Sequence, residues 1–184
     1  MALLESLSLP MGSKVLDFKL EGTDGKKYSL EDFDQAKVLV LVFMCNHCPY
    51  VQAIWDRLVE LQARFEERGV RFVGINPNTA NPEYSEETME KMQEHYQLYA
   101  MNFPYLEDKD QTVALKYQAQ CTPDIYVYNS ERKLSYHGRV DDNWKDAGAV
   151  EKEELADALE ALLNGEAVDQ LQRPAIGCSI KWVV

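Results

Sequence analysis

Cys45 and Cys48 are the residues of this chain whose types and spacing point most directly to chemistry. They are separated by Asn46 and His47, so the four residues form a Cys-x-x-Cys motif. Two thiols at this spacing can close a small disulfide ring, and each becomes a nucleophile when it loses its proton. The motif is therefore typical of a redox-active dithiol, although such a pair is also half of a zinc site.

The residues on either side of the motif indicate the elements that position it. Residues 38–43 are apolar at every position, as expected for a strand that is covered on both faces. From Val51 onward, apolar residues recur at steps of three and four, which predicts an amphipathic helix of about five turns that stops before Gly69. A buried strand thus delivers the motif to the start of a helix.

The helical pattern also predicts different surroundings for the two thiols. Cys48 lies three residues before Val51 and continues the buried face of the helix, whereas Cys45 precedes the first regular turn and should be more accessible. We therefore expect Cys45 to be the nucleophile that attacks a substrate disulfide, and Cys48 to be the resolving thiol that displaces the reduced product. Free backbone N–H groups, the helix dipole and a protonated His47 would lower the pKa of Cys45 from ~8.5 to roughly 3.5–7.5.

The rest of the chain alternates extended and helical patterns. An Asp-Gly turn between 17–20 and 27–30 predicts a hairpin, and 71–75 predicts a strand parallel to 38–43 through a right-handed crossover. Asn81-Pro82 resembles a helix cap with proline at the first helical position, and apolar and aromatic residues from Met89 to Tyr99 continue at helical steps. The other expected elements are a short helix at 111–117, an antiparallel hairpin formed by 125–128 and 134–140, and a last helix that ends near Asn164.

Length and composition limit the class of protein. With 184 residues, 46% of them hydrophobic, the chain can bury one sizeable core, and we expect a single domain over 1–184 with a C-terminal tail at 166–184. A formal net charge of −12 opposes binding to nucleic acid or to an anionic membrane. The sequence shows no leader or spanning pattern, and four cysteines are too few for a disulfide scaffold. We therefore expect a cytoplasmic protein.

The order of these elements around the motif resembles the thioredoxin fold. The likeness is carried by 43–51, 102–108, 113–117 and 121–124, and it extends over roughly residues 15–165. The chain is most similar to the redoxin branch of that superfamily, the alkyl hydroperoxide reductase/thiol-specific antioxidant group. This resemblance implies an α/β protein, a thioredoxin fold with an N-terminal hairpin extension and an inserted helix, whose central mixed sheet is flanked by helices.

The resemblance also implies roles for Thr122 and Pro123. In thioredoxin-like proteins the proline of such a pair is cis and lies against the dithiol, and the backbone of the residue before it pairs with bound substrate.

The chain departs from both well-known relatives at single positions. Thioredoxins proper carry a buried acid where Leu39 stands here. Peroxiredoxins carry a threonine at the position of Cys45 and an arginine near that of Gln120.

Two more cysteines lie close to these elements or in the tail. Cys121 adjoins the Thr-Pro pair and should come near Cys45. Cys178 lies in the segment 173–182, which resembles the tail of an uncharacterised peroxiredoxin-like subgroup with the same Cys-Asn-His-Cys motif. Because this segment contains apolar residues that favour burial, we expect it to fold over the active-site face, with Cys121 or Cys178 as an auxiliary thiol.

Three functions are compatible with these residues. The leading hypothesis is a thiol-disulfide oxidoreductase that acts on a protein or small-molecule disulfide and exchanges electrons with a partner such as a thioredoxin or glutathione system. The alternative is a peroxiredoxin-like thiol peroxidase, an antioxidant enzyme that reduces hydroperoxides. The third is a non-catalytic metal-binding or interaction module. We expect no cofactor and no metal for the redox chemistry.

Overall fold

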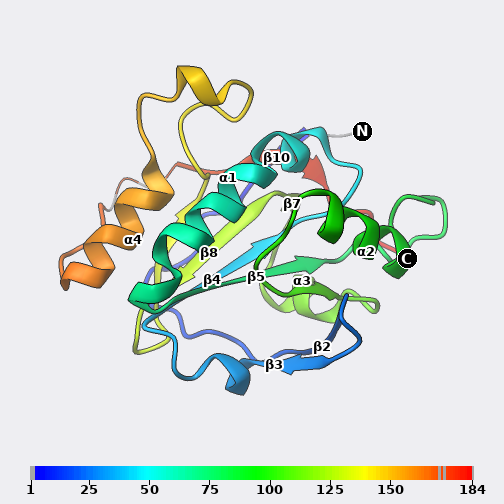
Figure 1. Ribbon diagram of the computed structural model, residues 1–184, viewed down its shortest axis with the longest axis horizontal. Coiled ribbons are helices and arrows are strands. Elements are labelled where there is room, and N and C mark those ends of the chain that lie inside the picture. The colour runs from blue at the N-terminus through cyan, green and yellow to red at the C-terminus, as the bar shows by residue number, and fades with distance from the viewer. Residues whose placement is uncertain (1–2, 170, 172, 184) are drawn as a thin grey trace.

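A seven-stranded mixed sheet forms the centre of the computed structural model, which describes residues 3–169, 171 and 173–183 (Figure 1). Its strand order is β3-β2-β6-β5-β4-β8-β9. These strands are β2 (Lys19–Gly22), β3 (Lys27–Ser29), β4 (Val38–Phe43), β5 (Val70–Asn76), β6 (Tyr105–Glu107), β8 (Asp124–Tyr128) and β9 (Leu134–Gly138). The α-helices are α1 (Pro49–Phe65), α2 (Met89–Leu98), α3 (Thr112–Lys116) and α4 (Glu154–Asn164), and 3-10 turns cover Leu30–Phe33, Glu66–Arg68 and Ala147–Ala149.

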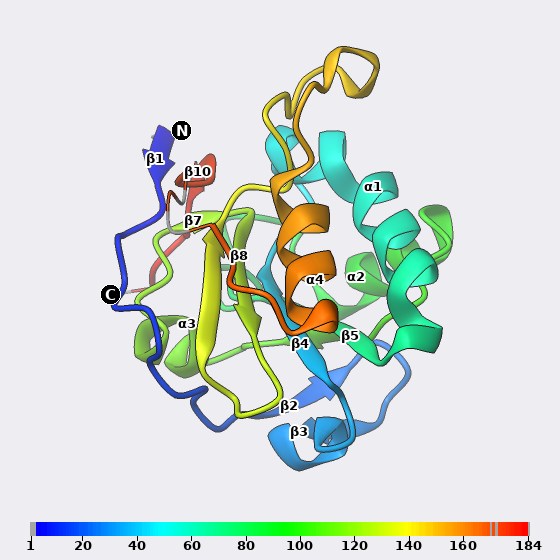
Figure 2. The same cartoon turned by 90° about the vertical axis from the view of Figure 1, so that its left-hand side faces the viewer.

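Strand β4 lies at the middle of this sheet and is buried on both faces, as its sequence predicts. It pairs parallel with β5 and antiparallel with β8. Figure 2 shows α1, α2 and α4 on one side of the sheet and α3 on the other. The β4 side chains alternate between the two cores, with Val38, Val40 and Val42 toward α1 and α4, and Leu39, Leu41 and Phe43 toward α3.

Helix α1 starts at Pro49, directly after the second cysteine of the motif. Cys48 is the N-cap residue with φ −77° and ψ 119°, an extended conformation that matches the restriction on a residue before proline. Proline is well suited to this first helical position because its missing N–H would have no intrahelical acceptor. The predicted stripe is confirmed, because Val51, Ile54 and Leu58 are buried, and Gly69 ends the segment with φ 96°.

Most of the other predicted elements are confirmed, but the start predicted at Asn81-Pro82 for the helix that contains Met89 and Met92 is wrong. The Asn81 side chain accepts a hydrogen bond from the Glu83 amide at 3.0 Å, which forms a local turn and not a helix cap. Helix α2 begins at Met89, and the hydroxyl of its N-cap Thr88 accepts the Lys91 amide at 3.2 Å. Asparagine caps a helix and closes an Asx turn by the same type of bond, so the dipeptide alone did not distinguish the two.

A second, three-stranded sheet lies above one end of the central sheet. It has the order β1-β10-β7, where β1 is Leu3–Glu5, β7 is Cys121–Thr122 and β10 is Ile176–Ser179. Both of its pairings are antiparallel, and Cys178 lies opposite Thr122. The C-terminal tail thus returns to the residue before Pro123, as expected from its apolar residues. Within that tail, 170, 172 and 184 lie outside the described residues.

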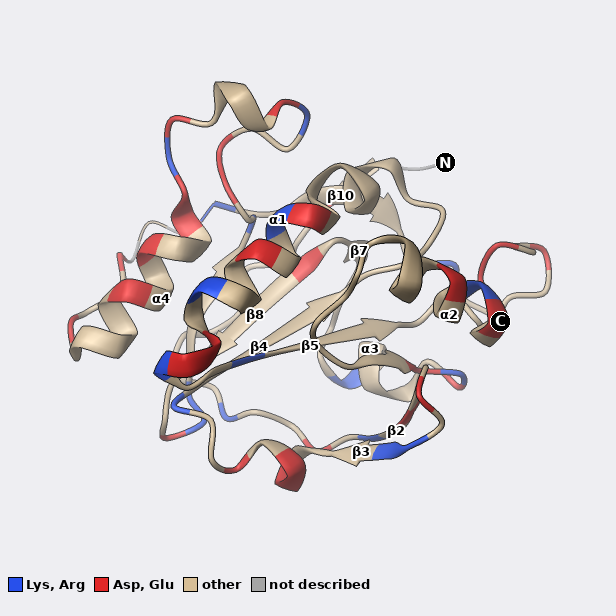
Figure 3. Cartoon of the chain, viewed as in Figure 1, with Lys and Arg blue, Asp and Glu red and all other residues tan. Residues whose placement is uncertain are grey.

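Charged residues of both signs are distributed along the helices and loops (Figure 3). On α1 they follow the side opposite the buried stripe, and Arg64 contacts Glu160 of α4 at 3.6 Å. Such exposed ion pairs contribute little to stability, typically about 0–1 kcal/mol. Within the described residues, none of the helices has the length and apolar character needed to cross a membrane.

Candidate redox site

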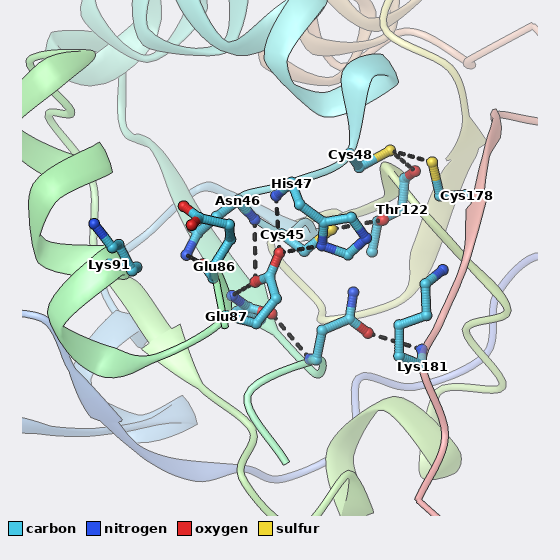
Figure 4. Close-up of polar contacts among 12 residues, drawn as sticks. Cys45, Asn46, His47, Cys48, Glu86, Glu87, Lys91, Thr122, Cys178 and Lys181 are labelled. Atoms are coloured by element: carbon cyan, nitrogen blue, oxygen red, sulfur yellow. Dashed lines mark hydrogen bonds and ion pairs between the residues drawn. The ribbon is translucent and has the colours of Figure 1, made fainter. Parts of the chain in front are cut away.

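The two cysteines of the motif lie where the carboxyl end of β4 meets the N-terminus of α1 (Figure 4). Both side chains are fully buried and reduced. The expectation that Cys45 is the more accessible thiol is therefore wrong. Cys45 leaves the central strand of the sheet, and Thr122 and Glu87 close over it from segments distant in sequence, whose position the helical pattern of α1 does not report.

Cys45 lies in surroundings that oppose ionisation. Its Sγ atom is 3.2 Å from the hydroxyl oxygen of Thr122. Burial raises the pKa of Cys45 well above its ordinary value, and the hydrogen bond to Cys48 and the negative charge of Glu87 raise it further. The thiolate-stabilising effects expected at Cys45 do not determine its charge here.

Cys48 is the thiol whose charged form these surroundings favour. The hydrogen bond from Cys45 is the main cause, and it lowers the pKa of Cys48 to about 5, with further lowering by Cys178 and by the Val51 amide and with burial opposing. The Val51 amide belongs to the first turn of α1, where N–H groups have no intrahelical acceptor. In its protonated form Cys48 donates to the carbonyl oxygen of Thr122 at 3.1 Å, a bond that the thiolate gives up.

Glu87 is a buried carboxylate that sequence reasoning did not identify as part of the site. Its Oε1 accepts the His47 amide at 2.8 Å and contacts His47 Nδ1 at 2.5 Å. Its Oε2 accepts the Asn46 amide at 3.2 Å and the Asn76 side-chain amide at 2.7 Å. Burial raises the pKa of Glu87, but these donors together outweigh it and leave the pKa below its ordinary value. A charged Glu87 therefore holds the backbone and the ring between the two cysteines.

His47 is fixed by this carboxylate and by an aromatic contact. Its ring stacks on Tyr84 with ring centroids 5.0 Å apart, and the Nζ atom of Lys181 lies 5.6 Å from the centroid of the same Tyr84 ring. The His47 Nε2 atom is buried and finds no hydrogen-bond partner among the described residues. Since Glu87 holds the Nδ1 side, Nε2 is the ring atom left for proton exchange or for a ligand.

The same residues provide the one group of potential metal ligands found within the described part of the chain. Ligand atoms of Cys45, His47 and Glu87 lie within 4.8 Å of one another. Tetrahedral zinc needs four ligands, and both carboxylate oxygens of Glu87 already accept hydrogen bonds from protein donors. The contacts of Glu87 therefore indicate a carboxylate that accepts hydrogen bonds from the protein, and not a ligand of a structural zinc site.

Thr122 and Pro123 lie against the dithiol, and the peptide bond between them is cis, as the resemblance implies. In addition to its two contacts with the cysteines, Thr122 pairs with Cys178 of β10. Cys178 brings its Sγ atom to 2.9 Å from Cys48 Sγ, whereas Cys121 Sγ contacts the Pro123 carbonyl oxygen at 3.8 Å. Of the two candidate auxiliary thiols, Cys178 is the one in direct contact with the motif.

Sequence reasoning missed other polar residues around the motif, and the signals for them were weak. Asn46 donates through its side chain to the Glu86 carbonyl oxygen at 2.8 Å and accepts from the Tyr105 hydroxyl at 2.9 Å. Asn46 lies inside the motif and was visible as a polar residue between two cysteines. Glu87 belongs to a run of acidic residues whose pattern indicates a solvated surface, and only its burial distinguishes it.

A thioredoxin fold that carries a buried dithiol beside a cis proline defines a redox protein of the thioredoxin-like class. Solved structures confirm the fold, such as the peroxidoxin BcpB of Mycobacterium tuberculosis, with a TM-score of 0.61 at 20% identity over 86% of this chain and 98% of that one. The family model described as AhpC/TSA family matches residues 11–137. The chain belongs to the AhpC/TSA family, and the predicted membership of the redoxin branch is confirmed.

More similar structures come from proteins without a stated activity. An uncharacterised conserved protein from Geobacillus kaustophilus is 40% identical, with a TM-score of 0.94 over 100% of this chain and 97% of that one. A hypothetical protein from Sinorhizobium meliloti 1021 is 37% identical, with a TM-score of 0.93 over 98% of each chain. The thiol-disulfide oxidoreductase ResA of Bacillus subtilis is 26% identical over 127 residues, which are 69% of this chain and just under two thirds (66%) of that protein.

Proposed function

We propose that this protein is a thiol-disulfide oxidoreductase in which Cys45 and Cys48 cycle between a dithiol and a disulfide. The observation that carries the proposal is the position of Cys48 at the start of α1, in contact with Cys178 and beside Cys45, where the hydrogen bond from Cys45 is the main cause that lowers its pKa. A thiolate at neutral pH is the species that attacks a disulfide, and a neighbouring protonated thiol can complete the exchange. The name of the B. subtilis relative supports the same class of reaction.

The charge distribution reverses the expected order of attack. In the proposed cycle the Cys48 thiolate attacks one sulfur of a substrate disulfide, and a Cys48–substrate bond forms as the first substrate thiolate leaves. Cys45 then attacks Cys48 Sγ and closes the Cys45–Cys48 disulfide, while its proton passes to the second departing thiolate. The substrate gains two electrons and the dithiol loses two. A thiol reductant such as a thioredoxin or glutathione system would supply two electrons and reduce the enzyme again. We keep a cytoplasmic location as part of this proposal.

Trapping experiments on single cysteine variants test the proposal. Reduced wild-type protein, C45S and C48S are mixed with oxidised glutathione, quenched with acid, alkylated and analysed by mass spectrometry. We expect an internal disulfide in the wild-type protein, a glutathione adduct that forms first on Cys48 in C45S, and slower adduct formation on Cys45 in C48S. Adducts on Cys45 alone would restore the order predicted from the sequence, and unreacted thiols in all three proteins would reject the proposed function.

A thiol peroxidase is the second candidate, because a thiolate at a helix N-terminus and membership of the AhpC/TSA family both suit that reaction. Cys48 would attack the hydroperoxide, become a sulfenic acid and release the alcohol or water, and Cys45 would condense with it to a disulfide and release water. Parallel oxidation by hydrogen peroxide and by oxidised glutathione separates the two candidates. Faster loss of thiols with peroxide at equal concentration would favour the peroxidase. Purified protein that retains metal and keeps its thiols unreactive would favour the metal-binding module.

A further inference from the structure

Cys48 has a second sulfur beside it that does not belong to the Cys-x-x-Cys motif. Cys178 Sγ lies 2.9 Å from Cys48 Sγ, on the strand that pairs with Thr122 (Figure 4). A disulfide bond is about 2.05 Å long, so a closure of less than about 1 Å would join these two sulfurs. Their separation of 130 in residue number places the contact beyond any local pattern.

The position of Cys178 is determined by contacts on both sides of β10. On the side before it, Gly177 packs directly on the Thr122 backbone, where a Cβ atom would lie 2.0 Å from the carbonyl oxygen. On the side after it, the Ile180 amide donates to the Gln120 carbonyl oxygen at 2.9 Å, and the Lys181 amide donates to Asn78 Oδ1 at 2.9 Å. The thiol is therefore held against Cys48 by the backbone of a docked strand.

We propose that Cys178 is a third redox-active cysteine, which forms a disulfide with Cys48 in competition with Cys45. This rests on the proposed function, because the reaction starts from the same Cys48–substrate disulfide. Cys178 Sγ attacks Cys48 Sγ, the Cys48–Cys178 bond forms, the Cys48–substrate bond breaks, and the proton of Cys178 passes to the departing substrate thiolate. The substrate disulfide gains two electrons, and Cys48 and Cys178 each supply one. Cys45 remains a thiol throughout.

Cys121, the other thiol outside the motif, does not have this geometry. It precedes Thr122 on β7, so its side chain points to the opposite face of that strand. Its Sγ atom contacts the Pro123 carbonyl oxygen at 3.8 Å. Burial raises its pKa far above the ordinary range, with the charge of Asp124 adding to the effect. Cys121 is therefore a matched control for the loss of a buried thiol.

The proposed disulfide would fix the position of the C-terminal tail as well as oxidise Cys48. It would join the first turn of α1 to β10 covalently, while β10 occupies the backbone edge of Thr122. An extended peptide binds a sheet edge through main-chain hydrogen bonds, and that edge is taken as long as β10 is docked. Oxidation to Cys48–Cys178 would lock this arrangement, whereas oxidation to Cys45–Cys48 would leave the tail free to undock.

Tryptic peptides distinguish the two disulfides without ambiguity. Cleavage after Lys37 and Arg57 leaves both motif cysteines in one peptide, so Cys45–Cys48 is an internal link. Cys178 lies in a separate peptide, 153–181, because Arg173 is followed by proline, and Cys48–Cys178 is therefore a link between peptides. The full-length reduced protein is treated with oxidised glutathione, quenched with acid, alkylated and digested without reduction. The variants are C45S/C121S, which retains only Cys48 and Cys178, and the matched variant C45S/C178S.

We expect C45S/C121S to lose both thiols and give the linked peptides, and C45S/C178S to stop at a glutathione adduct on Cys48. A second variant, G177A, should reduce the yield of Cys48–Cys178 at least tenfold without removing a thiol. A persistent Cys48 adduct in C45S/C121S, with native circular dichroism, would overturn the proposal and leave the proposed function intact. No adduct and no disulfide in any variant or in the wild-type protein would instead reject the proposed function.

Discussion

Gly177 and Thr122 are in such close backbone contact that a Cβ atom on Gly177 would lie 2.0 Å from the Thr122 carbonyl oxygen and 2.5 Å from its carbonyl carbon. Backbone atoms cannot rotate away as a side chain can. The contact therefore explains why a glycine precedes Cys178 in a strand, where glycine otherwise has an entropic cost. It also makes the docking of β10 testable without altering a cysteine.

We expect Gly177→Ala to lower the free energy of unfolding by about 1–3 kcal/mol, the usual cost of forcing an extra carbon into a packed region. Denaturant unfolding followed by circular dichroism measures the change. Gly148→Ala is the matched control, because its Cβ would lie 3.3 Å from a single side-chain oxygen of Asp146. Equal stability of wild-type protein and Gly177→Ala would contradict the close packing of β10 on Thr122.

Glu87 should make the stability of the protein depend on acid. The pKa of Glu87 is lowered in the folded state, so its contribution is complete above the unfolded value of about 4.3 and is lost as the pH falls through the folded value. At pH near 7 we expect Glu87→Gln to be less stable than the wild-type protein by about 2–3 kcal/mol, since hydrogen bonds to a charged group are lost.

Unfolding curves of the two proteins should converge as the pH is lowered from 5 toward 2. Glu86→Gln is the control, because Glu86 is exposed and only its backbone carbonyl oxygen contacts the site. A constant stability difference between wild-type protein and Glu87→Gln over this pH range would mean that Glu87 is already protonated in the folded protein.

The thiolate should be found on Cys48, and Cys45 should be responsible for it. The pKa of Cys48 is about 5 with the Cys45 hydrogen bond as the main cause, so the thiolate absorbance of the reduced wild-type protein should persist from pH 8 down to about that value. We expect Cys45→Ala to raise this pKa and Cys121→Ala to leave it unchanged. A thiolate signal that disappears between pH 9 and 8 in the wild-type protein would refute the assignment.

His47 should influence the redox potential, because its ring lies between the two cysteines in sequence and is held by Glu87. The negative charge of Glu87 adds to the raised pKa of Cys45, and the His47 ring is one of the donors that hold this carboxylate. Without the ring this charge is less compensated and the thiolate form of the dithiol becomes less favourable, so His47→Ala should shift the reduction potential to a more negative value. We expect a change on the order of 30 mV, equivalent to about a tenfold change in the exchange equilibrium. Equilibration with glutathione buffers measures it, and an unchanged potential would remove His47 from the proposed mechanism.

The elements that deliver the dithiol could be predicted because their signals are local. Six consecutive apolar residues indicate a doubly covered strand, and the stripe that begins at Val51 indicates the buried face of α1. The Cys-x-x-Cys spacing is itself a local property. The helix start predicted at Asn81-Pro82 was wrong for a local reason too, since one Asn side chain can satisfy either a helix end or a turn.

The amino-acid sequence by itself determined the fold class, the position of the dithiol between β4 and α1, and the burial of Cys48. The tertiary structure alone decided which thiol is charged, because the pKa of a buried group depends on neighbours from any part of the chain. Burial is the main cause of the raised pKa of Cys45 and the Cys45 hydrogen bond is the main cause of the lowered pKa of Cys48. Glu87 and Cys178 add to these two shifts, and neither lies within 35 residues of its thiol in the sequence. Electrostatic and hydrogen-bond effects act over a few ångströms in space, and only the folded chain defines those distances.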